Sequence, residues 1–507
     1  CCNQARDESF AGVQLGEVDE FIRLVRLVDG ARATDDGRQA ACLELAGLGS
    51  VDDHMFAVVA GQPPRQRFRR AVVLRPQRRD MRQALDRHVG LGGHAFHLRQ
   101  DVLGDVAFQV GHVADDLHRA PTQHIGGPDH ERKADALESF WKQQIGDASL
   151  ENAALNSIKY ENHLSRRDVI GILRSTRDWN GVNQQEINDL RNFYNYAINT
   201  THVRDDVKVL SQKVIFSDPS NAWYTGSDSV KDPLGNIQNG FSSNNMSLLI
   251  GKHFLGTDRP MIHNDTNGNV AGTYTKAGGR LFMNGISAND IDQGASGTCY
   301  FLSSLAGTAN EKSHLIRDMF TDNGDGTYSV RFHTNNKVDY VTVDKMMATS
   351  ASGRYIYSDQ GDGTATNALV AGNNELWVAL AEKAYAQVNE SGRLGQQEST
   401  NRYGIAKTEG ISWGSLTNGI KHVTGLSASW GEVNASGVNG VSSQELMDLV
   451  NSNKVVTVAW NGHARSIVDY DPLTGQYDIR NPYDQNHSSL THAQLINNDA
   501  YVAWSNS

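Results

Sequence analysis

A single cysteine lies in the last 460 residues of this chain, within the segment DIDQGASGTCYFL at residues 290–302. Phe301, Leu302, Leu305 and Ala306 follow it at helical spacing, so we expect Cys299 at or near a helix N-terminus. The positive end of a helix dipole favours a thiolate, which is the nucleophilic form of cysteine. The segment therefore indicates covalent acyl-transfer chemistry.

Three of the residues in the segment that precedes Cys299 fit the same chemistry. Gly294 and Gly297 keep the turn free of side chains, which would let a substrate backbone approach. The amide of Gln293 and the backbone N–H of Cys299 could together form an oxyanion hole. Each feature alone has an ordinary structural explanation, since glycines make turns and glutamine is common in loops.

A base and its partner are expected in a β-hairpin near the end of the chain. A strand is predicted at residues 455–460, a turn at 471–475 and a returning strand at 477–480. A turn centred near residue 472 places His463 opposite Asn481. His463 would accept the thiol proton, and Asn481 would orient the imidazole.

These motifs resemble those of the calpain-type cysteine peptidases, in a form closer to the bacterial calpain-like proteins than to the animal ones. The resemblance rests on Gln-Gly-x-x-Gly-x-Cys-aromatic-Phe-Leu, Glu375-Leu-Trp-x-Ala-Leu-x-Glu-Lys-Ala-Tyr385, Gly462-His-Ala-x-Ser466 and Arg480-Asn-Pro482, and covers roughly residues 276–485. It implies an α+β, papain-like fold of two subdomains with a Cys299–His463–Asn481 triad. Thr298, Tyr300 and Tyr483 depart from the calpain pattern, which has an acidic residue at the first position and tryptophan at the other two.

The same resemblance implies calcium binding within the peptidase core. Asp290, nine residues before Cys299, and Glu375 match the acidic positions of that site, and carboxylates suit a hard cation. The alternative is that Asp290 caps a turn and Glu375 lies at a helix N-terminus. A second calcium site after the Asn-Pro motif is not expected, because Gln485, Asn486 and His487 occupy that position. No organic cofactor is implied.

A change in composition divides the chain near residue 135. The first 132 residues contain 17 arginines but no lysine and no tyrosine, whereas all 16 tyrosines follow. We predict an atypical Arg/His-rich segment at 1–135, a small helical domain at 136–215, a linker at 216–275 and the peptidase domain at 276–507. The arginines at 65–82 could form an anion-binding patch, and His94 with His97 a metal site. A weakly structured segment explains both features better, so we assign it no function and expect it to be dispensable.

The composition also limits the possible partners. A net charge of −11 argues against broad nucleic-acid binding, and no run of about 18 apolar residues predicts a membrane span. We therefore expect a soluble protein that acts on proteins or peptides, in either the cytoplasm or a secreted location.

The sequence as a whole predicts a cysteine endopeptidase that forms a thioester acyl-enzyme. Two alternatives remain: a transglutaminase-like acyl transferase, and a catalytically silent module that binds proteins in the same cleft. Asparagine rather than aspartate as the orienting residue disfavours the first, and the presence of every catalytic group disfavours the second.

Overall fold

The computed structural model describes residues 44–51, 54–60, 72–74 and 142–506, apart from 159–163, 179, 199–202, 227–230, 336, 365 and 439. Residues 1–127 and 128–507 form two separate compact units. In the first, β1 (Glu44–Val51), β2 (His54–Ala60) and β3 (Val72–Leu74) form an antiparallel sheet. His94 and His97 lie outside the described residues, as does the arginine-rich stretch 65–82 except for β3.

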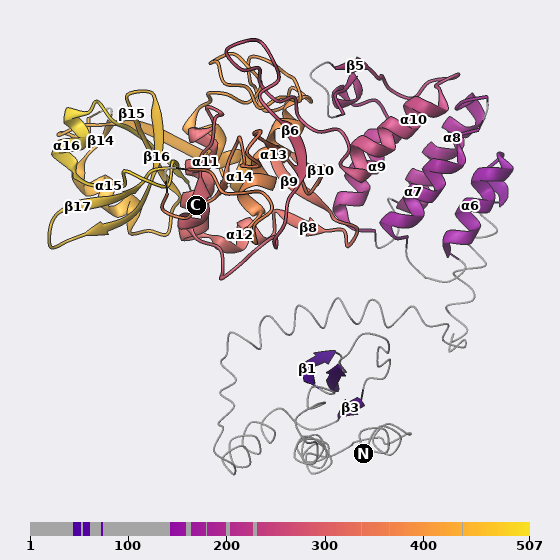
Figure 1. Ribbon diagram of the computed structural model, residues 1–507, viewed down its shortest axis with the longest axis horizontal. Coiled ribbons are helices and arrows are strands. Elements are labelled where there is room, and N and C mark those ends of the chain that lie inside the picture. Colours follow the sequence, from indigo (N-terminus) through magenta and orange to yellow (C-terminus); the bar gives the residue numbers. More distant parts are fainter. Residues whose placement is uncertain are drawn as a thin grey trace. The chain divides into compact units, whose positions relative to one another are not determined.

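The second unit begins with a helical region, residues 142–255 (Figure 1). Its helices are α6 (Ala148–Ile158), α7 (Arg166–Ser175), α8 (Gln184–Phe193), α9 (Asp205–Ile215) and α10 (Ser243–Ile250). Sequence patterns explain where they begin: Asn183 caps α8 and Glu186 completes a capping box, while Ser165 and Asp168 do the same for α7. Their apolar faces share one core.

The predicted linker at 216–275 is wrong, because much of this segment is packed. It contains β4 (Trp223–Tyr224), β5 (Asp232–Pro233), α10 and β6 (Thr273–Lys276). Phe241, Met246, Leu249 and Phe254 are buried in the core of the helical region. The asparagines and serines that suggested a linker instead cap and connect short elements, as Ser242 does at the start of α10.

The helical region is joined to the next part of the chain by buried charges. Lys213 on α9 forms an ion pair with Asp339 and donates to the Tyr340 carbonyl over 2.8 Å. Arg393 bridges Asp339 and Asp218, at 2.8 and 2.5 Å. The helical region is therefore not isolated from the rest of this unit, as the predicted small helical domain would be, because α9 packs directly against strand β10 (Lys337–Asp344).

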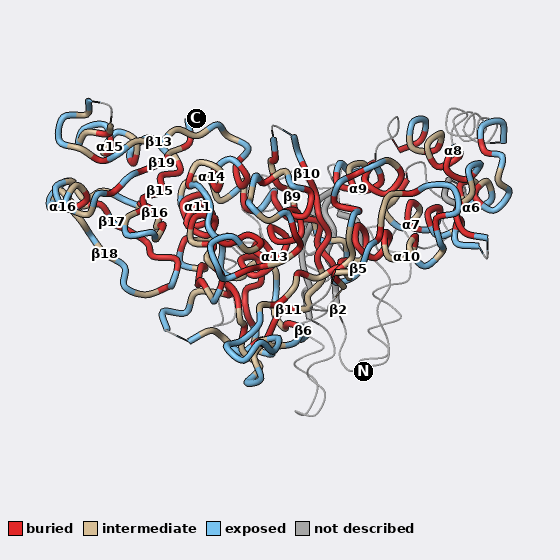
Figure 2. Tube along the Cα trace, turned by 90° about the horizontal axis from the view of Figure 1, so that it is seen from above, coloured by how far each residue is buried: buried red, intermediate tan, exposed pale blue. Residues whose placement is uncertain are grey.

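We call residues 256–426 the Cys299 region. Its centre is formed by two buried helices, α11 (Cys299–Glu311) and α13 (Trp377–Asn389) (Figure 2). A hairpin is formed by β9 (Thr327–Thr334) and β10 (Lys337–Asp344), with β8 (Phe320–Asp322) beside β9. The remaining elements are α12 (Ser313–Arg317), α14 (Leu416–Thr424), the pair β6–β11 (Met346–Thr349) and the pair β7 (Ile291–Asp292)–β12 (Asp359–Gln360).

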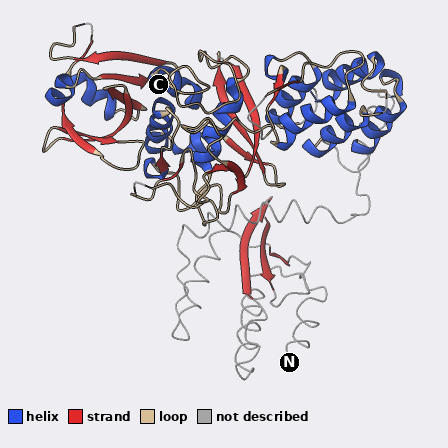
Figure 3. Cartoon of the chain, turned by 45° about the horizontal axis from the view of Figure 1, so that its top comes forward, coloured by secondary structure: helices blue, strands red, loops and turns tan. Residues whose placement is uncertain are grey.

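Residues 427–506, the sheet region, contain a seven-stranded sheet with its own apolar core (Figure 3). The strand order is β14-β13-β19-β15-β16-β17-β18, antiparallel except for β13 with β14. The strands are β13 (Ala428–Val433), β14 (Gly440–Val441), β15 (Val456–Trp460), β16 (His463–Asp471), β17 (Gln476–Arg480), β18 (Ser488–Thr491) and β19 (Tyr501–Ser505), with helices α15 (Ser443–Val450) and α16 (His492–Asn497). The mixed helix-and-sheet architecture agrees with the predicted α+β class.

Contacts between α11 and β16 join the Cys299 region to the sheet region. Ser466 Oγ donates to the Ser303 carbonyl over 2.6 Å, and Asn310 Nδ2 donates to the Val468 carbonyl over 2.8 Å. The helix that begins at Cys299 is thus fixed against the strand that begins at His463. None of the described helices is long and apolar enough to cross a membrane.

Candidate active site

Cys299 is the first residue of α11, as the sequence predicted. The backbone N–H groups of Ala464 and Tyr300 and the nearby Arg465 charge act to lower the pKa of its thiol. Burial has the larger effect, however, so the pKa is raised above the ordinary value. The expected stabilisation of a thiolate by the helix start is present, but desolvation outweighs it.

Thr298, which replaces the acidic residue of the calpain pattern, is fully buried and donates its hydroxyl to Glu382 on α13. The other carboxylate oxygen of Glu382 accepts the backbone N–H of Ser358 over 2.8 Å. Burial raises the pKa of this carboxyl group. An acidic side chain at position 298 would face Glu382, whereas threonine supplies a neutral donor, so the departure is compatible with this packing.

His463 and Asn481 are brought together, with His463 Nε2 2.8 Å from Asn481 Oδ1. In a neutral ring this contact fixes the proton on Nε2 and leaves Nδ1 as the acceptor. Burial lowers the pKa of His463, and the bond to Asn481 opposes that shift. Among the described residues, no hydrogen bond joins the His463 ring to the Cys299 sulfur, although the backbone N–H of the adjacent Ala464 interacts with that sulfur.

The strand pairing that achieves this differs from the predicted register. Ser466 pairs with Arg480, two residues from the predicted partner Asp478, and a bulge interrupts the ladder between Ile467 and Asp469. The turn occupies residues 472–475 and ends in Gly475 with a φ of 69°, so its centre lies beyond residue 472. Asn481 consequently follows the last paired residue and reaches His463 through its side chain.

Two further residues lie close to the imidazole. The Tyr483 ring stacks on His463 with centroids 5.1 Å apart and planes 19° apart. Arg465 donates to the His463 carbonyl over 2.9 Å, and its guanidinium carbon lies 3.6 Å from the Trp460 ring centroid. Sequence reasoning overlooked Arg465, because it occupies the unspecified position of Gly-His-Ala-x-Ser and only the fold brings its charge near Cys299.

Gln293 is buried, and its side-chain amide donates to the Ser296 carbonyl over 2.7 Å. One amide hydrogen is therefore used within the loop, and the second takes part in no other hydrogen bond among the described residues. Its backbone N–H donates to the Pro482 carbonyl over 2.8 Å, which links this loop to the segment that carries Asn481. Gly294 serves packing rather than substrate approach, since a Cβ there would lie 2.4 Å from the Ile356 and Tyr357 carbonyl oxygens.

Asp290 and Glu375 are near enough for the Asp290 charge to raise the pKa of Glu375. Burial is the larger cause, and together they raise the pKa of Glu375 to about 8; burial also raises the pKa of Asp290. Asp290 Oδ2 accepts from the Ser287 N–H and from Trp377 Nε1, at 2.8 and 3.1 Å. Glu375 Oε1 accepts from the Met283 N–H over 2.7 Å. Asp290 thus caps a turn, as the structural alternative predicted, and each carboxylate keeps one oxygen outside these bonds.

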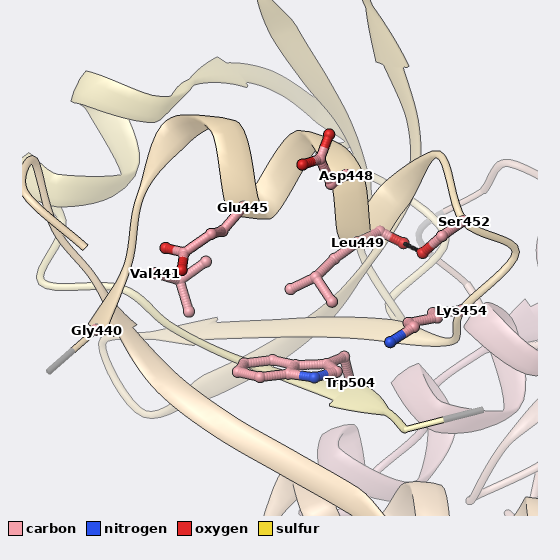
Figure 4. Close-up of a pocket in the computed structure, with 8 residues that line it drawn as sticks. All are labelled: Gly440, Val441, Glu445, Asp448, Leu449, Ser452, Lys454 and Trp504. Atoms are coloured by element: carbon pink, nitrogen blue, oxygen red, sulfur yellow. Dashed lines mark hydrogen bonds between the residues drawn. The ribbon is translucent and has the colours of Figure 1, made fainter. Parts of the chain in front are cut away.

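A cavity of about 470 Å³ lies elsewhere, on the sheet region (Figure 4). The Trp504 indole forms one side, and Leu449 of α15 lies above it with Glu445, Asp448 and Lys454 at the edge. None of the predicted site residues lines this cavity. No group of three or more His, Cys, Asp or Glu side chains that could hold a metal ion occurs among the described residues.

Comparison with known proteins identifies the class of this site. Residues 272–485 match the model of the calpain family cysteine protease, the family whose motifs the sequence resembles. The match begins four residues before the predicted boundary.

Relatives come from plants and animals. The chain is 32% identical over 113 residues to the calpain-type cysteine protease DEK1 of Zea mays, covering 22% of this chain and 5% of that protein. It is 28% identical over 160 residues to the calpain-2 catalytic subunit of Gallus gallus, covering 30% and 19%. Calpain clp-4 of Caenorhabditis elegans is 32% identical over 116 residues, covering 22% and 14%. The chain thus spans less than a fifth of the length of each of these relatives.

Proposed function

We propose that this chain is a cysteine endopeptidase in which Cys299 is the nucleophile, His463 the general base and acid, and Asn481 the orienting residue. The observation that carries the proposal is the His463–Asn481 hydrogen bond on a strand packed against the helix that starts at Cys299. A papain-like arrangement of two subdomains is part of the proposal, with the Cys299 region and the sheet region on either side of the substrate.

The reaction follows from the atoms available. Nδ1 of His463 takes the thiol proton as the sulfur attacks the peptide carbonyl, because Nε2 is held by Asn481. The pKa of the thiol is raised and that of the imidazole lowered, so proton transfer accompanies attack rather than preceding it. The Cys299 N–H and the second amide hydrogen of Gln293 would stabilise the oxyanion. His463 then protonates the leaving amine, and water hydrolyses the thioester.

Hydrolysis of an unstructured protein such as casein by the full chain tests this function. Wild-type protein should produce peptides, and Cys299→Ala should produce none while keeping the same circular dichroism spectrum. Turnover by folded Cys299→Ala would contradict the assignment. Incorporation of a labelled amine into casein without chain cleavage would instead support a transglutaminase-like transfer.

We also propose that a calcium ion binds between Asp290 and Glu375. The support is the chemistry of the two donors, since both are carboxylates and each has one oxygen free of the hydrogen bonds described above. Bound calcium would supply positive charge at this point between the loop before Cys299 and the start of α13.

Two measurements test this proposal. Isothermal titration of the full chain with Ca²⁺ should show binding at micromolar to millimolar levels that is lost in Asp290→Asn/Glu375→Gln, and EGTA should reduce casein hydrolysis. Unchanged activity in EGTA together with no detectable binding would exclude the site.

A further inference from the structure

Trp413 has a backbone conformation that is rare for a bulky residue. Its φ is 62°, in the left-handed region that non-glycine residues seldom adopt. The conformation is held by hydrogen bonds to the loop before Cys299: the Trp413 N–H donates to the Gly297 carbonyl over 2.9 Å, and the Gly297 N–H donates to Ser412 Oγ over 3.1 Å. The surrounding structure thus maintains a strained residue against Gly297, which lies two positions before the candidate nucleophile Cys299.

The indole of Trp413 extends from the Cys299 region to the sheet region. A Cβ added to Gly297 would lie 3.1 Å from Trp413 Cδ1, and one added to Gly462 would lie 3.4 Å from Trp413 Cη2. Gly297 is two residues before Cys299, and Gly462 directly precedes His463. The two edges of one ring therefore lie against the two glycines, one of which closely precedes Cys299 and the other His463.

The same side chain is not simply part of the core. Trp413 is 44% exposed, although it is large and apolar. Lys407 Nζ lies 5.3 Å from its ring centroid, which is cation–π geometry. The indole is thus an accessible surface group that occupies space lined by two glycines.

Building on the proposed peptidase function, we propose that Trp413 is a specificity-determining residue that restricts the size of the substrate side chain next to the scissile bond. The substrate carbonyl that Cys299 attacks, with His463 as the base, must lie between these two residues. Each of them closely follows one of the two glycines in the chain. Because the indole fills the glycine-lined space there, small side chains such as alanine fit beside it, whereas large ones require it to be displaced. Substrates with a small residue on the amino side of the cleaved bond are therefore preferred.

Two assays on the full chain test this size restriction. The first compares kcat/KM for paired peptides that differ only in Ala or Phe before the cleaved bond. The second compares the rates at which peptidyl chloromethyl ketones ending in Ala or Phe label Cys299, with the labelled cysteine identified by peptide mass spectrometry. Trp413→Ala should raise the Phe/Ala ratio by roughly tenfold or more in both assays, and Trp413→Phe should raise it less.

Controls separate this effect from loss of folding or of reactivity. Trp430 on β13 is 64% exposed, and Trp430→Ala should leave the ratio unchanged. Trp413→Gly, which accepts a positive φ, should give the same ratio as Trp413→Ala if the missing ring is the cause. The labelling rate with iodoacetamide, measured in wild type and in both variants, reports the general accessibility of Cys299 separately from the effect of side-chain size.

The outcomes are distinct. A Phe/Ala ratio that stays unchanged or falls in folded Trp413→Ala and Trp413→Gly would overturn the size restriction. Selective labelling of Cys299 without any peptide hydrolysis would contradict the proposed peptidase function, yet the labelling ratio would still decide the role of Trp413.

Discussion

The Cys299 region and the sheet region bury different kinds of side chain. Around α13 the buried side chains include Glu382, Lys383 and Glu390, and the β7–β12 pair adds Asp292 and Asp359. Among the described residues of the sheet region, the buried charged side chains are those of the Arg480–Asp484 ion pair, and the strands pack through apolar residues such as Val458, Ile467 and Val502. The nucleophile is thus set among ionisable groups, whose charge depends on pH, whereas the base is presented by a sheet held by apolar packing. Substitutions in the Cys299 region and in the sheet region should therefore affect activity and stability in different ways.

The largest effect is expected in the sheet region, at His463. His463→Ala should lower kcat by roughly 10²- to 10⁴-fold, because no other described base adjoins Cys299, and the melting temperature should change little because His463 is only half-buried. Asn481→Ala should keep measurable activity, since it orients the ring without exchanging protons. Steady-state hydrolysis and thermal melts of both variants provide the measurement. Equal activity of His463→Ala and wild type would require a different base.

A smaller loss of kcat is expected in the Cys299 region, at Gln293. Gln293→Ala should lower kcat by roughly 10²- to 10³-fold with little change in KM, as expected for one oxyanion donor. Gln293 also bonds to the Ser296 carbonyl, so a purely structural role would lower the melting temperature instead. Gln293→Glu is the matched control, because it keeps the size but cannot donate as a carboxylate. Full activity in this variant would exclude the oxyanion role.

The sequence predicted local features well and burial poorly. The start of α11 at Cys299 and the hairpin that carries His463 follow from periodicity and turn residues, which act over a few positions. The raised pKa of Cys299 could not be predicted, because it depends on desolvation by distant segments. The same holds for Trp413, whose contact with Gly462 joins positions 49 residues apart. The linker prediction failed because composition does not show which few apolar residues become buried.

Stability should depend most on buried charge at the border of the helical region. Lys252 is buried and pairs with Asp258 and Glu390. These carboxylates raise its pKa despite the opposing effect of burial, so it stays charged. Lys252→Met should lower the free energy of unfolding by about 3–5 kcal/mol, because two buried carboxylates lose their partner. Urea unfolding measures this change, with the exposed Lys421→Met as control. A decrease in unfolding free energy equal to that of the control would show that the ion pairs of Lys252 do not contribute to stability.

The smallest effect on stability is expected from substitution of Asp292. It should appear only when melting temperatures are compared at different pH values. Asp292 and Asp359 are directly paired across β7 and β12, with Asp362 and the Arg480-bound Asp484 nearby. Burial, then the neighbouring carboxylates, raise the pKa of Asp292 to about 8, and burial is the main cause that raises the pKa of Asp359 to about 7. The folded state therefore binds protons more tightly than the unfolded one, whose aspartates titrate near pH 4.

It follows that this pair contributes most to stability below pH 4 and that the contribution is lost as the pH rises toward 8. Asp292→Asn keeps a neutral side chain at every pH, so it should melt roughly 2–4 °C above wild type at pH 8 and close to wild type at pH 5. Asp448→Asn, at an exposed position on α15, should show no such difference between the two pH values. A melting temperature below wild type at pH 8 would mean that the Asp292 carboxylate is stabilised there, for instance by a bound cation, and would reverse the assigned sign.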